Sequence, residues 1–235
     1  MSAPLLCELH AHTTWSDGEL TIGRLADLYG RAGFDVLCIT DHTLRHAGAH
    51  CSVGARDFAA YLREIDGEAA RVRRLYDLLL IPGLELTYDD PNPLLAAHAV
   101  AVGLRSHLLL DAGLDAALAR AREHGAALVA AHPYAREDAA TAPRATAAFE
   151  ARPELAAAVD RFELVNRHET FGWVAAGRLP AVATGDFHRP EHLGSWKTLL
   201  PCAKSESAVV AHLRSRAPAY ITRFDPGALT DAVAA

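Results

Sequence analysis

The sequence has little of several features that define specialised classes of protein. Its four cysteines are dispersed over 235 residues and form no C-x-x-C pair, which is typical of reduced, mostly packed thiols in a cytosolic protein. No uninterrupted apolar segment is long enough to cross a bilayer, and no basic segment followed by an apolar one indicates a signal peptide. We therefore expect a cytoplasmic protein with no membrane contact.

A long basic run is also missing. The chain has 23 lysines and arginines against 29 aspartates and glutamates, a formal net charge of −6. Proteins that hold long nucleic acids need an extended track of basic side chains for the phosphates. We therefore expect no extended nucleic-acid binding, although this charge does not exclude a small anionic substrate held by metal ions.

Hydrophobic residues, by contrast, make up 51% of the chain, enough for a substantial core in one large domain over residues 1–235. Apolar strands alternate with amphipathic helices, which predicts parallel βα units in a barrel-like α/β fold. The segment 136–160 gives no secure prediction, and the tail 226–235 is expected to be frayed. The expected strands are 5–9, 36–40, 78–87, 96–104, 126–131, 162–165, 181–184 and 219–222. The expected helices are 22–32, 58–75, 114–124 and 209–213.

The stretch Cys7 to Gly18, C-E-L-H-A-H-T-T-W-S-D-G, carries the first chemical signal. Positions i and i+2 of a strand point to the same side, so His10 and His12 can face one point. A turn at Ser16-Asp17-Gly18 could fold a carboxylate over that point. Two imidazoles beside a carboxylate make a nascent metal site, but a strand end with two exposed histidines gives the same pattern. The outcome depends on whether later strands supply more ligands.

Later strands do end in such side chains, because histidines and acidic residues recur at the carboxyl edge of nearly every expected strand. The set comprises His10, His12, Asp17, His42, Glu85, His98, His132, Asp186 and His188. Each has another interpretation alone: His98 as a hydrogen-bonded core histidine, Glu85 as an ion-pair partner, Asp186 as a turn cap. Together they fit two or three divalent transition-metal ions, with ligand types that suit Mn, Zn or Fe.

These motifs resemble those of the PHP (polymerase and histidinol phosphatase) family. The resemblance is carried in order by H-A-H-T-T-W-S-D-G, I-T-D-H, G-L-E-L-T, the central His98, A-H-P and G-D-F-H, and covers residues 5–199. It is closest to the small stand-alone metal-dependent phosphoesterases, which S-W-K-T-L near Ser195 also fits. The resemblance implies a distorted (β/α)7 TIM-like barrel with a trinuclear metal site.

The resemblance also implies a division of the ligands. One ion would be held by His10, His12, Glu85 and Asp186. Glu85 would bridge to a second ion held by His98 and His132. A third would be held by Asp17, His42 and His188. Asp41, next to His42, is expected to orient an imidazole.

The predicted activity is hydrolysis of a small soluble phosphate mono- or diester by a metal-bridging hydroxide, with Asp186, Glu85 and His188 as catalytic residues. Arg136, Arg167 and Arg189 are the candidates for binding substrate phosphate, with Lys197 a weaker one. The histidines outside the motifs, His192 among them, are expected on the solvated surface. One alternative is hydrolysis of a carboxylic ester, carbamate or amide at the same site. Another is a non-catalytic, metal-stabilised interaction module. Nothing in the sequence sets the oligomeric state.

Overall fold

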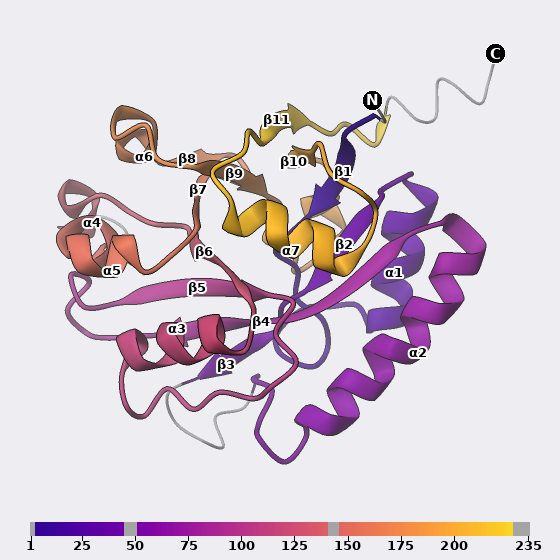
Figure 1. Cartoon of the computed structure of the whole chain (residues 1–235), viewed down its shortest axis with the longest axis horizontal. Coiled ribbons are helices and arrows are strands. Elements are labelled where there is room, and N and C mark those ends of the chain that lie inside the picture. The colour runs from indigo at the N-terminus through magenta and orange to yellow at the C-terminus, as the bar shows by residue number, and fades with distance from the viewer. Residues whose placement is uncertain (1–2, 45–50, 141–145, 228–235) are drawn as a thin grey trace.

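The alternation of apolar strands with amphipathic helices produces one curled sheet (Figure 1). The computed structural model describes residues 3–44, 51–140 and 146–227. Within them the strands are β1 (Leu5–Glu8), β2 (Val36–Ile39), β3 (His42–Leu44), β4 (Leu79–Tyr88), β5 (Ala97–Val102), β6 (Ala127–Ala131), β7 (Arg161–Asn166), β8 (Glu169–Thr170), β9 (Ala181–Thr184), β10 (Trp196–Leu200) and β11 (Tyr220–Arg223). Their order in the sheet is β11-β10-β1-β2-β4-β5-β6-β7-β8, with β3 paired to β4 and β9 paired to β7.

The helices confirm all four expected helical segments. They are α1 (Ile22–Arg31), α2 (Phe58–Tyr76), α3 (Leu114–Glu123), α4 (Ala148–Ala151), α5 (Pro153–Ala157), α6 (Gly172–Ala176) and α7 (Glu206–Arg214), with 3₁₀ turns η1 (Arg136–Ala140) and η2 (Pro190–Leu193). Thr21 caps α1, as its side chain accepts a hydrogen bond from Arg24 N. The unassigned segment 136–160 contributes η1, α4 and α5. In the expected frayed tail, residues 228–235 lie outside the described residues.

Strand β5 departs from the expected parallel arrangement. It runs antiparallel to both β4 and β6, whereas β1–β2, β2–β4, β6–β7 and β7–β9 are parallel pairs. The link between β4 and β5, residues 89–96, is too short for the crossover helix that a parallel connection requires. The beginning of β5 therefore reaches the edge of the sheet at which β6 ends.

The sheet curls until β9 approaches β10. Thr198 Oγ1 accepts a hydrogen bond from Ala183 N at 2.9 Å and donates one to Ala183 O at 2.7 Å. Between the described strands β9 and β10, however, no backbone ladder forms. The fold is a mixed α/β arrangement around a curled sheet, without the complete ring of backbone hydrogen bonds of a closed barrel.

Alternate strand residues fill the inside of the curled sheet, where Cys7, Val36, Val100 and Val129 are buried. Cys7 and Cys38 are buried thiols as expected, whereas Cys51 is exposed. Helix α7 adds Val209 and Leu213 to this cluster. No helix in the described part of the chain has both the length and the apolar character of a membrane span.

Candidate metal centre

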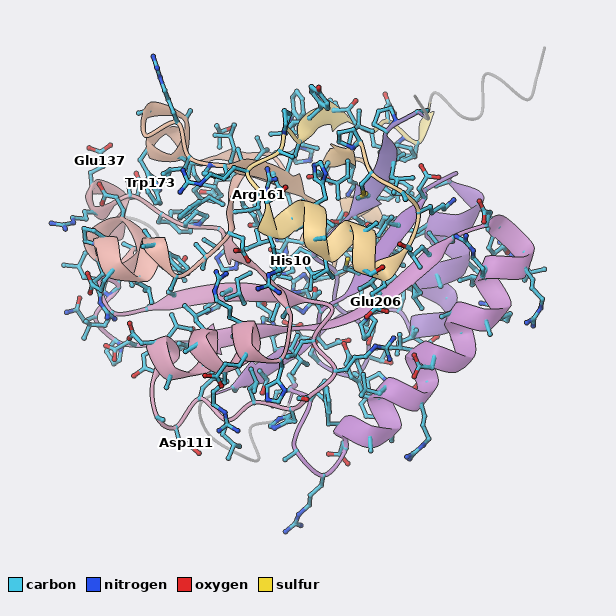
Figure 2. All side chains as sticks on the ribbon, viewed as in Figure 1. His10, Asp111, Glu137, Arg161, Trp173 and Glu206 are labelled. Atoms are coloured by element: carbon cyan, nitrogen blue, oxygen red, sulfur yellow. The ribbon has the colours of Figure 1, made fainter. Side chains whose placement is uncertain are left out.

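His10 and His12 follow β1 in a segment that pairs with Phe187. His12 N donates to Phe187 O at 2.8 Å, and Phe187 N donates to His10 O at 3.1 Å. This pairing brings Asp186 and His188, the neighbours of Phe187, beside the two histidines. The Nε2 atoms of His10 and His12 lie 3.0 Å apart, and Asp186 Oδ1 lies 3.6 and 3.5 Å from them. His10, fully buried, lies in the interior of the molecule (Figure 2). The two imidazoles converge, as their spacing predicted.

Glu85 lies inside β4 and reaches the middle of the site. Its Oε1 atom is 3.1 Å from His98 Nδ1 and 3.2 Å from His132 Nε2. Its Oε2 atom is 3.5 Å from the Nε2 atoms of both His10 and His12. One carboxylate thus faces two sets of imidazoles. His98 is the second residue of the antiparallel β5, so it joins the site from the beginning of a strand.

His42 and Asp17 form a third side of the site. His42 opens β3, which is not among the expected strands, and its Nδ1 lies 2.7 Å from Thr87 Oγ1. Asp17 Oδ1 lies 3.5 Å from His42 Nε2 and 3.3 Å from His188 Nε2. The turn after His12 therefore does fold the Asp17 carboxylate back over the histidines.

The nine residues form three groups whose ligand atoms lie within 4.8 Å of one another. The groups are His10 with His12 and Asp186; Glu85 with His98 and His132; and His12 with Asp17, His42 and His188. This division differs from the one implied by the family resemblance in two ways: His12 belongs to two groups, and Glu85 belongs to one. Glu85 Oε2, which faces His10 and His12, connects the first two groups.

Two features of these groups fit divalent cations. Among the described residues, Glu85 Oε2 is the buried side-chain polar atom with no hydrogen-bond partner. Its 2.7 Å contact with His42 Nδ1 is an ion-pair distance without hydrogen-bond geometry. A buried carboxylate oxygen without a hydrogen bond is costly, and coordination to a cation relieves that cost. The facing Nε2 atoms of His10 and His12 likewise suit a shared electrophile, since imidazole nitrogens and carboxylates are common transition-metal ligands.

Acids and imidazoles lie close together in this buried site, and this proximity shifts their pKa values. Burial raises the pKa of the Glu85 carboxyl, but the neighbouring His42 and His10 outweigh it and hold that pKa well below its ordinary value. Burial beside His42 lowers the pKa of His12 to about 3. Against burial, Glu85 and Asp17 raise the pKa of His42 to about 10. In the metal-free protein the proton on His42 therefore supplies positive charge that a cation would otherwise supply.

The site opens into a cavity of about 460 Å³. Seven of the nine residues line it, and its other walls are Tyr134, Asn166, Arg167, His168 and Glu169. Tyr134 Oη donates to Glu169 Oε2 at 2.8 Å. The cavity therefore combines ligand atoms with polar side chains that could contact a substrate.

The three arginines expected to bind phosphate lie in different places. Arg167 lines the cavity, where its Nη2 donates to Asp186 Oδ2 at 3.0 Å. Arg189 lines an adjoining cavity of about 650 Å³ that Arg167 and His168 also border. Arg136 lies outside both of these cavities and donates to Ala151 O at 2.8 Å. Arg167 is thus the one placed directly beside a predicted ligand.

Several supporting residues differ from the expectation. Asp41 accepts hydrogen bonds from Thr13 and Ser16, so it holds the loop after His12 rather than an imidazole. Lys197, the weaker candidate for binding phosphate, is fully buried, pairs with Glu8 and lines neither cavity.

His192 also departs from its expected solvated position. Its Nδ1 atom accepts from His188 N at 3.1 Å, and it lines the adjoining cavity.

Two carboxylates that sequence reasoning missed contact imidazoles of the site: Glu163 contacts His10, and Asp89 contacts His98. The available signal for Glu163 was an acidic residue within the apolar strand R-F-E-L-V-N.

Three of the site's turns have backbone conformations that side chains other than glycine rarely adopt. His132, Arg167 and Asp186 have φ values of 30°, 52° and 41°. Gly185, beside Asp186, has no room for a side chain, because a Cβ atom would collide with Glu8 and Lys197. The ligand-bearing turns are therefore held by the surrounding structure.

Solved structures of known proteins share this fold. A two-domain protein from Bacteroides vulgatus ATCC 8482 that contains a predicted PHP-like metal-dependent phosphoesterase aligns with a TM-score of 0.62, 20% identity, and 93% of this chain and 64% of that one. An amidohydrolase from Chromobacterium violaceum, with bound sulfate and no metal, aligns with a TM-score of 0.58, 16% identity, and 92% and 97% of the two chains.

Sequence comparison gives a more limited match. No protein-family model matches the chain. Over 88 residues it is 30% identical to the DNA polymerase/3'-5' exonuclease PolX of Bacillus subtilis (strain 168). That match covers 35% of this chain and 15% of PolX, so it reaches only a small part of that protein.

Proposed function

We propose, from the premise that this chain has the fold of PHP-like metal-dependent phosphoesterases, that it is a metal-dependent hydrolase of small phosphate esters. The observation that carries the proposal is the shared cavity of the three ligand groups and the Arg167 guanidinium. Divalent cations held by these groups, beside a fixed arginine, would suit a compact anion such as a phosphoryl group.

The nine residues would hold two or three divalent ions, of Mn, Zn or Fe, in the groups described above. Such ions, when bound, lower the pKa of a water and neutralise charge on phosphoryl oxygens. Glu85 is the proposed bridge, because its two oxygens face different sets of imidazoles. The finer arrangement, a trinuclear centre at this edge of the curled sheet, belongs to this proposal.

The chain's own residues would orient the substrate and move the proton. Arg167 is held by three hydrogen bonds to Asp186, two of them to its backbone oxygen, so its guanidinium is fixed at the cavity wall. We assign it the role of orienting a phosphoryl oxygen. Asp186 is assigned to accept the proton of the attacking water, and His188 to keep the Asp17 and Asp186 carboxylates in place through contacts of 3.3 and 3.4 Å.

The decisive experiment measures release of inorganic phosphate from a panel of nucleotides, sugar phosphates and other small esters by Mn-reconstituted protein. We expect turnover of at least one phosphate ester, abolished by chelator and restored by Mn²⁺. Arg167→Lys should raise KM or lower kcat for that ester, because a lysine loses the planar fork that engages Asp186. Absence of phosphate release from every monoester and of alcohol release from every diester, with normal metal content, would contradict the proposal.

The second candidate is hydrolysis of a carboxylic ester, carbamate or amide. It is favoured by the Chromobacterium violaceum neighbour, which is named as an amidohydrolase. The same panel with aryl carboxylic esters and amides separates the two. Rapid cleavage of those compounds, insensitive to Arg167→Lys and without phosphate release, would favour this candidate.

A further inference from the structure

Glu163 is a fully buried carboxylate in the middle of β7 for which the proposed reaction has no role. Four groups surround its two oxygens. Oε1 lies 2.9 Å from His10 Nδ1 and accepts from Thr184 Oγ1 at 2.6 Å. Oε2 accepts from His132 N at 2.6 Å and from Asn166 Nδ2 at 2.8 Å. Four contacts match the number of hydrogen bonds that a carboxylate can accept.

This arrangement determines which nitrogen of His10 carries the proton. A backbone N–H and an amide NH₂ can only donate, and the Thr184 hydroxyl also donates to the carboxylate. The fourth contact is favourable only if His10 Nδ1 also donates. His10 Nε2 then carries the lone pair, and this is the atom that lies 3.0 Å from His12 Nε2 and 3.6 Å from Asp186 Oδ1.

The bond to His132 N has a different consequence. His132 has a φ of 30°, so its turn is strained and needs a partner that fixes it. The 2.6 Å bond from its backbone N–H to Glu163 holds the turn that presents His132 Nε2 to Glu85. His10 and His132 belong to different ligand groups, so one carboxylate contacts both groups.

We propose that Glu163 is a positioning residue that holds His10 in the Nδ1–H tautomer and fixes the turn of His132, so that both imidazoles present Nε2 to bound metal. A carboxylate in this position also makes the imidazole a stronger ligand. The inference rests on the proposed metal centre but not on the identity of the ester that is hydrolysed.

The test compares Glu163→Gln with Asp160→Asn by calorimetric titration of Mn²⁺ into the metal-free proteins. Asp160 is a matched control because it is also a well-buried acid next to β7, bonded to Leu128 N and Arg122 but to no predicted ligand. A glutamine must turn its NH₂ group toward at least one donor. Glu163→Gln should weaken binding of one or two ions by about 10- to 100-fold. Asp160→Asn should lower the melting temperature with unchanged Mn²⁺ affinity.

Nitrogen-15 NMR of the imidazole of His10 in the metal-free wild type supplies a readout that needs no variant. We expect the Nδ1–H form or the doubly protonated ring; a neutral Nε2–H ring overturns the inference even if Glu163→Gln fails to fold. Wild-type affinity for all ions in Glu163→Gln, or equal losses in Asp160→Asn, also overturns it. These outcomes leave the proposed function intact if the wild type binds Mn²⁺ and releases phosphate. A wild type that binds no Mn²⁺ overturns both.

Discussion

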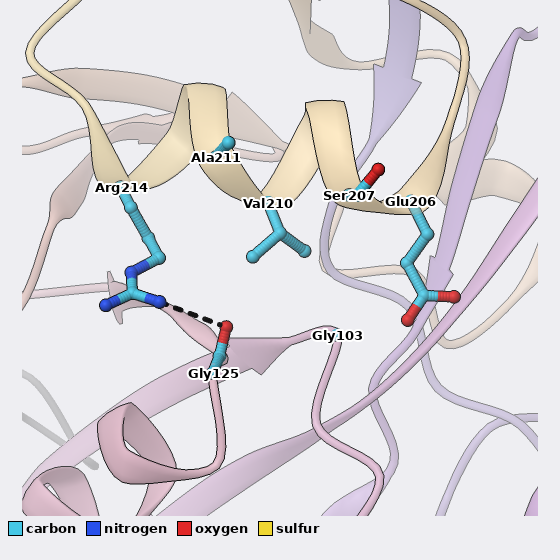
Figure 3. Close-up of a pocket in the computed structure, with 7 residues that line it drawn as sticks. All are labelled: Gly103, Gly125, Glu206, Ser207, Val210, Ala211 and Arg214. Carbon is cyan, nitrogen blue, oxygen red and sulfur yellow. Dashed lines mark hydrogen bonds between the residues drawn. The ribbon is translucent and has the colours of Figure 1, made fainter.

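Two cavities lie at opposite ends of β5 and β6, and none of the predicted metal ligands lines the larger one. The metal-centre cavity, of about 460 Å³, is beside His98 and His132 at one end of these strands. The other, here called the α7 groove, is about 600 Å³ and is lined by Gly103, Gly125, Glu206, Ser207, Val210, Ala211 and Arg214 (Figure 3).

The polar groups of the two cavities differ in how they are satisfied. In the α7 groove, Arg105 donates two hydrogen bonds to Glu206. Arg214 donates one to Gly125 O. In the metal centre, Glu85 Oε2 is buried without a hydrogen-bond partner. A buried acceptor without a hydrogen bond fits coordination to a cation, whereas cavity size alone does not identify a site.

When equivalent substitutions in the two cavities are compared, the largest expected difference is in activity. Asp186→Asn removes the charge that faces His10 and His12 and the proposed proton acceptor, and should lower kcat/KM by about 10²- to 10⁴-fold. Ser207→Ala in the α7 groove should leave kcat/KM unchanged. Phosphate release under identical Mn²⁺ loading is the measurement, and equal losses in the two variants would remove the functional difference between the cavities.

Metal content should be the next most sensitive property. Glu85→Gln keeps the shape of the side chain but removes the charge shared between two ligand groups. We expect it to lower the bound metal at both groups together, measured by elemental analysis after dialysis. Glu206→Gln is the matched change in the α7 groove and should retain all of its metal. Loss of a single ion from Glu85→Gln, with activity kept, would refute the bridging role.

The free energy of unfolding should fall when a buried, fully hydrogen-bonded charge is removed. Arg161, 2% exposed, donates to the backbone oxygens of Leu213, His212, Ser215 and Ala217 at the end of α7 (Figure 2). Arg161→Met removes a charged donor from each of these backbone oxygens and should cost about 2–4 kcal/mol of unfolding free energy in urea. Turnover per folded molecule should not change. Arg214→Met removes an exposed arginine of α7, and its free energy of unfolding should stay within about 0.5 kcal/mol of that of the wild type.

The smallest effect concerns pH. Burial, with help from the charge of Arg167, lowers the pKa of His192 to about 4, below the ordinary value of 6.5. Between these values the unfolded chain binds more protons at this residue, so its contribution to stability is lost as pH falls from 6.5 toward 4. Metal-free His192→Gln should therefore show a shallower decline in unfolding free energy over this range. Identical slopes for the two proteins would contradict the assignment.

The residues of the site were predictable because they obey local rules. His10 and His12 converge because alternate residues of an extended segment share a side, and His132 and Asp186 follow buried strands whose ends meet at one edge. His98 was included for an incorrect reason, since it lies near the beginning of an antiparallel strand. Strand direction depends on which partners are hydrogen-bonded, and the sequence pattern of a single strand does not record it.

Long-range partners were beyond such rules. Glu163 contacts His10 across 153 residues, and Lys197 contacts Glu8 across 189, so no local spacing connects either pair. Strand β10 was missed for a related reason: its lysine reads as a surface residue, but Glu8 compensates the buried charge.

The left-handed turns at His132, Arg167 and Asp186 have a consequence for protein engineering. Each side chain in this conformation is less stable than glycine by about 1 kcal/mol or more, yet glycine there would delete a proposed ligand or the guanidinium. Arg178, with a φ of 51° at an exposed turn after α6, has the same backbone conformation without such a role. Glycine substitutions that raise thermostability should therefore be found at positions such as Arg178. At the rim of the cavity, the strained side chains must be kept for the proposed reaction.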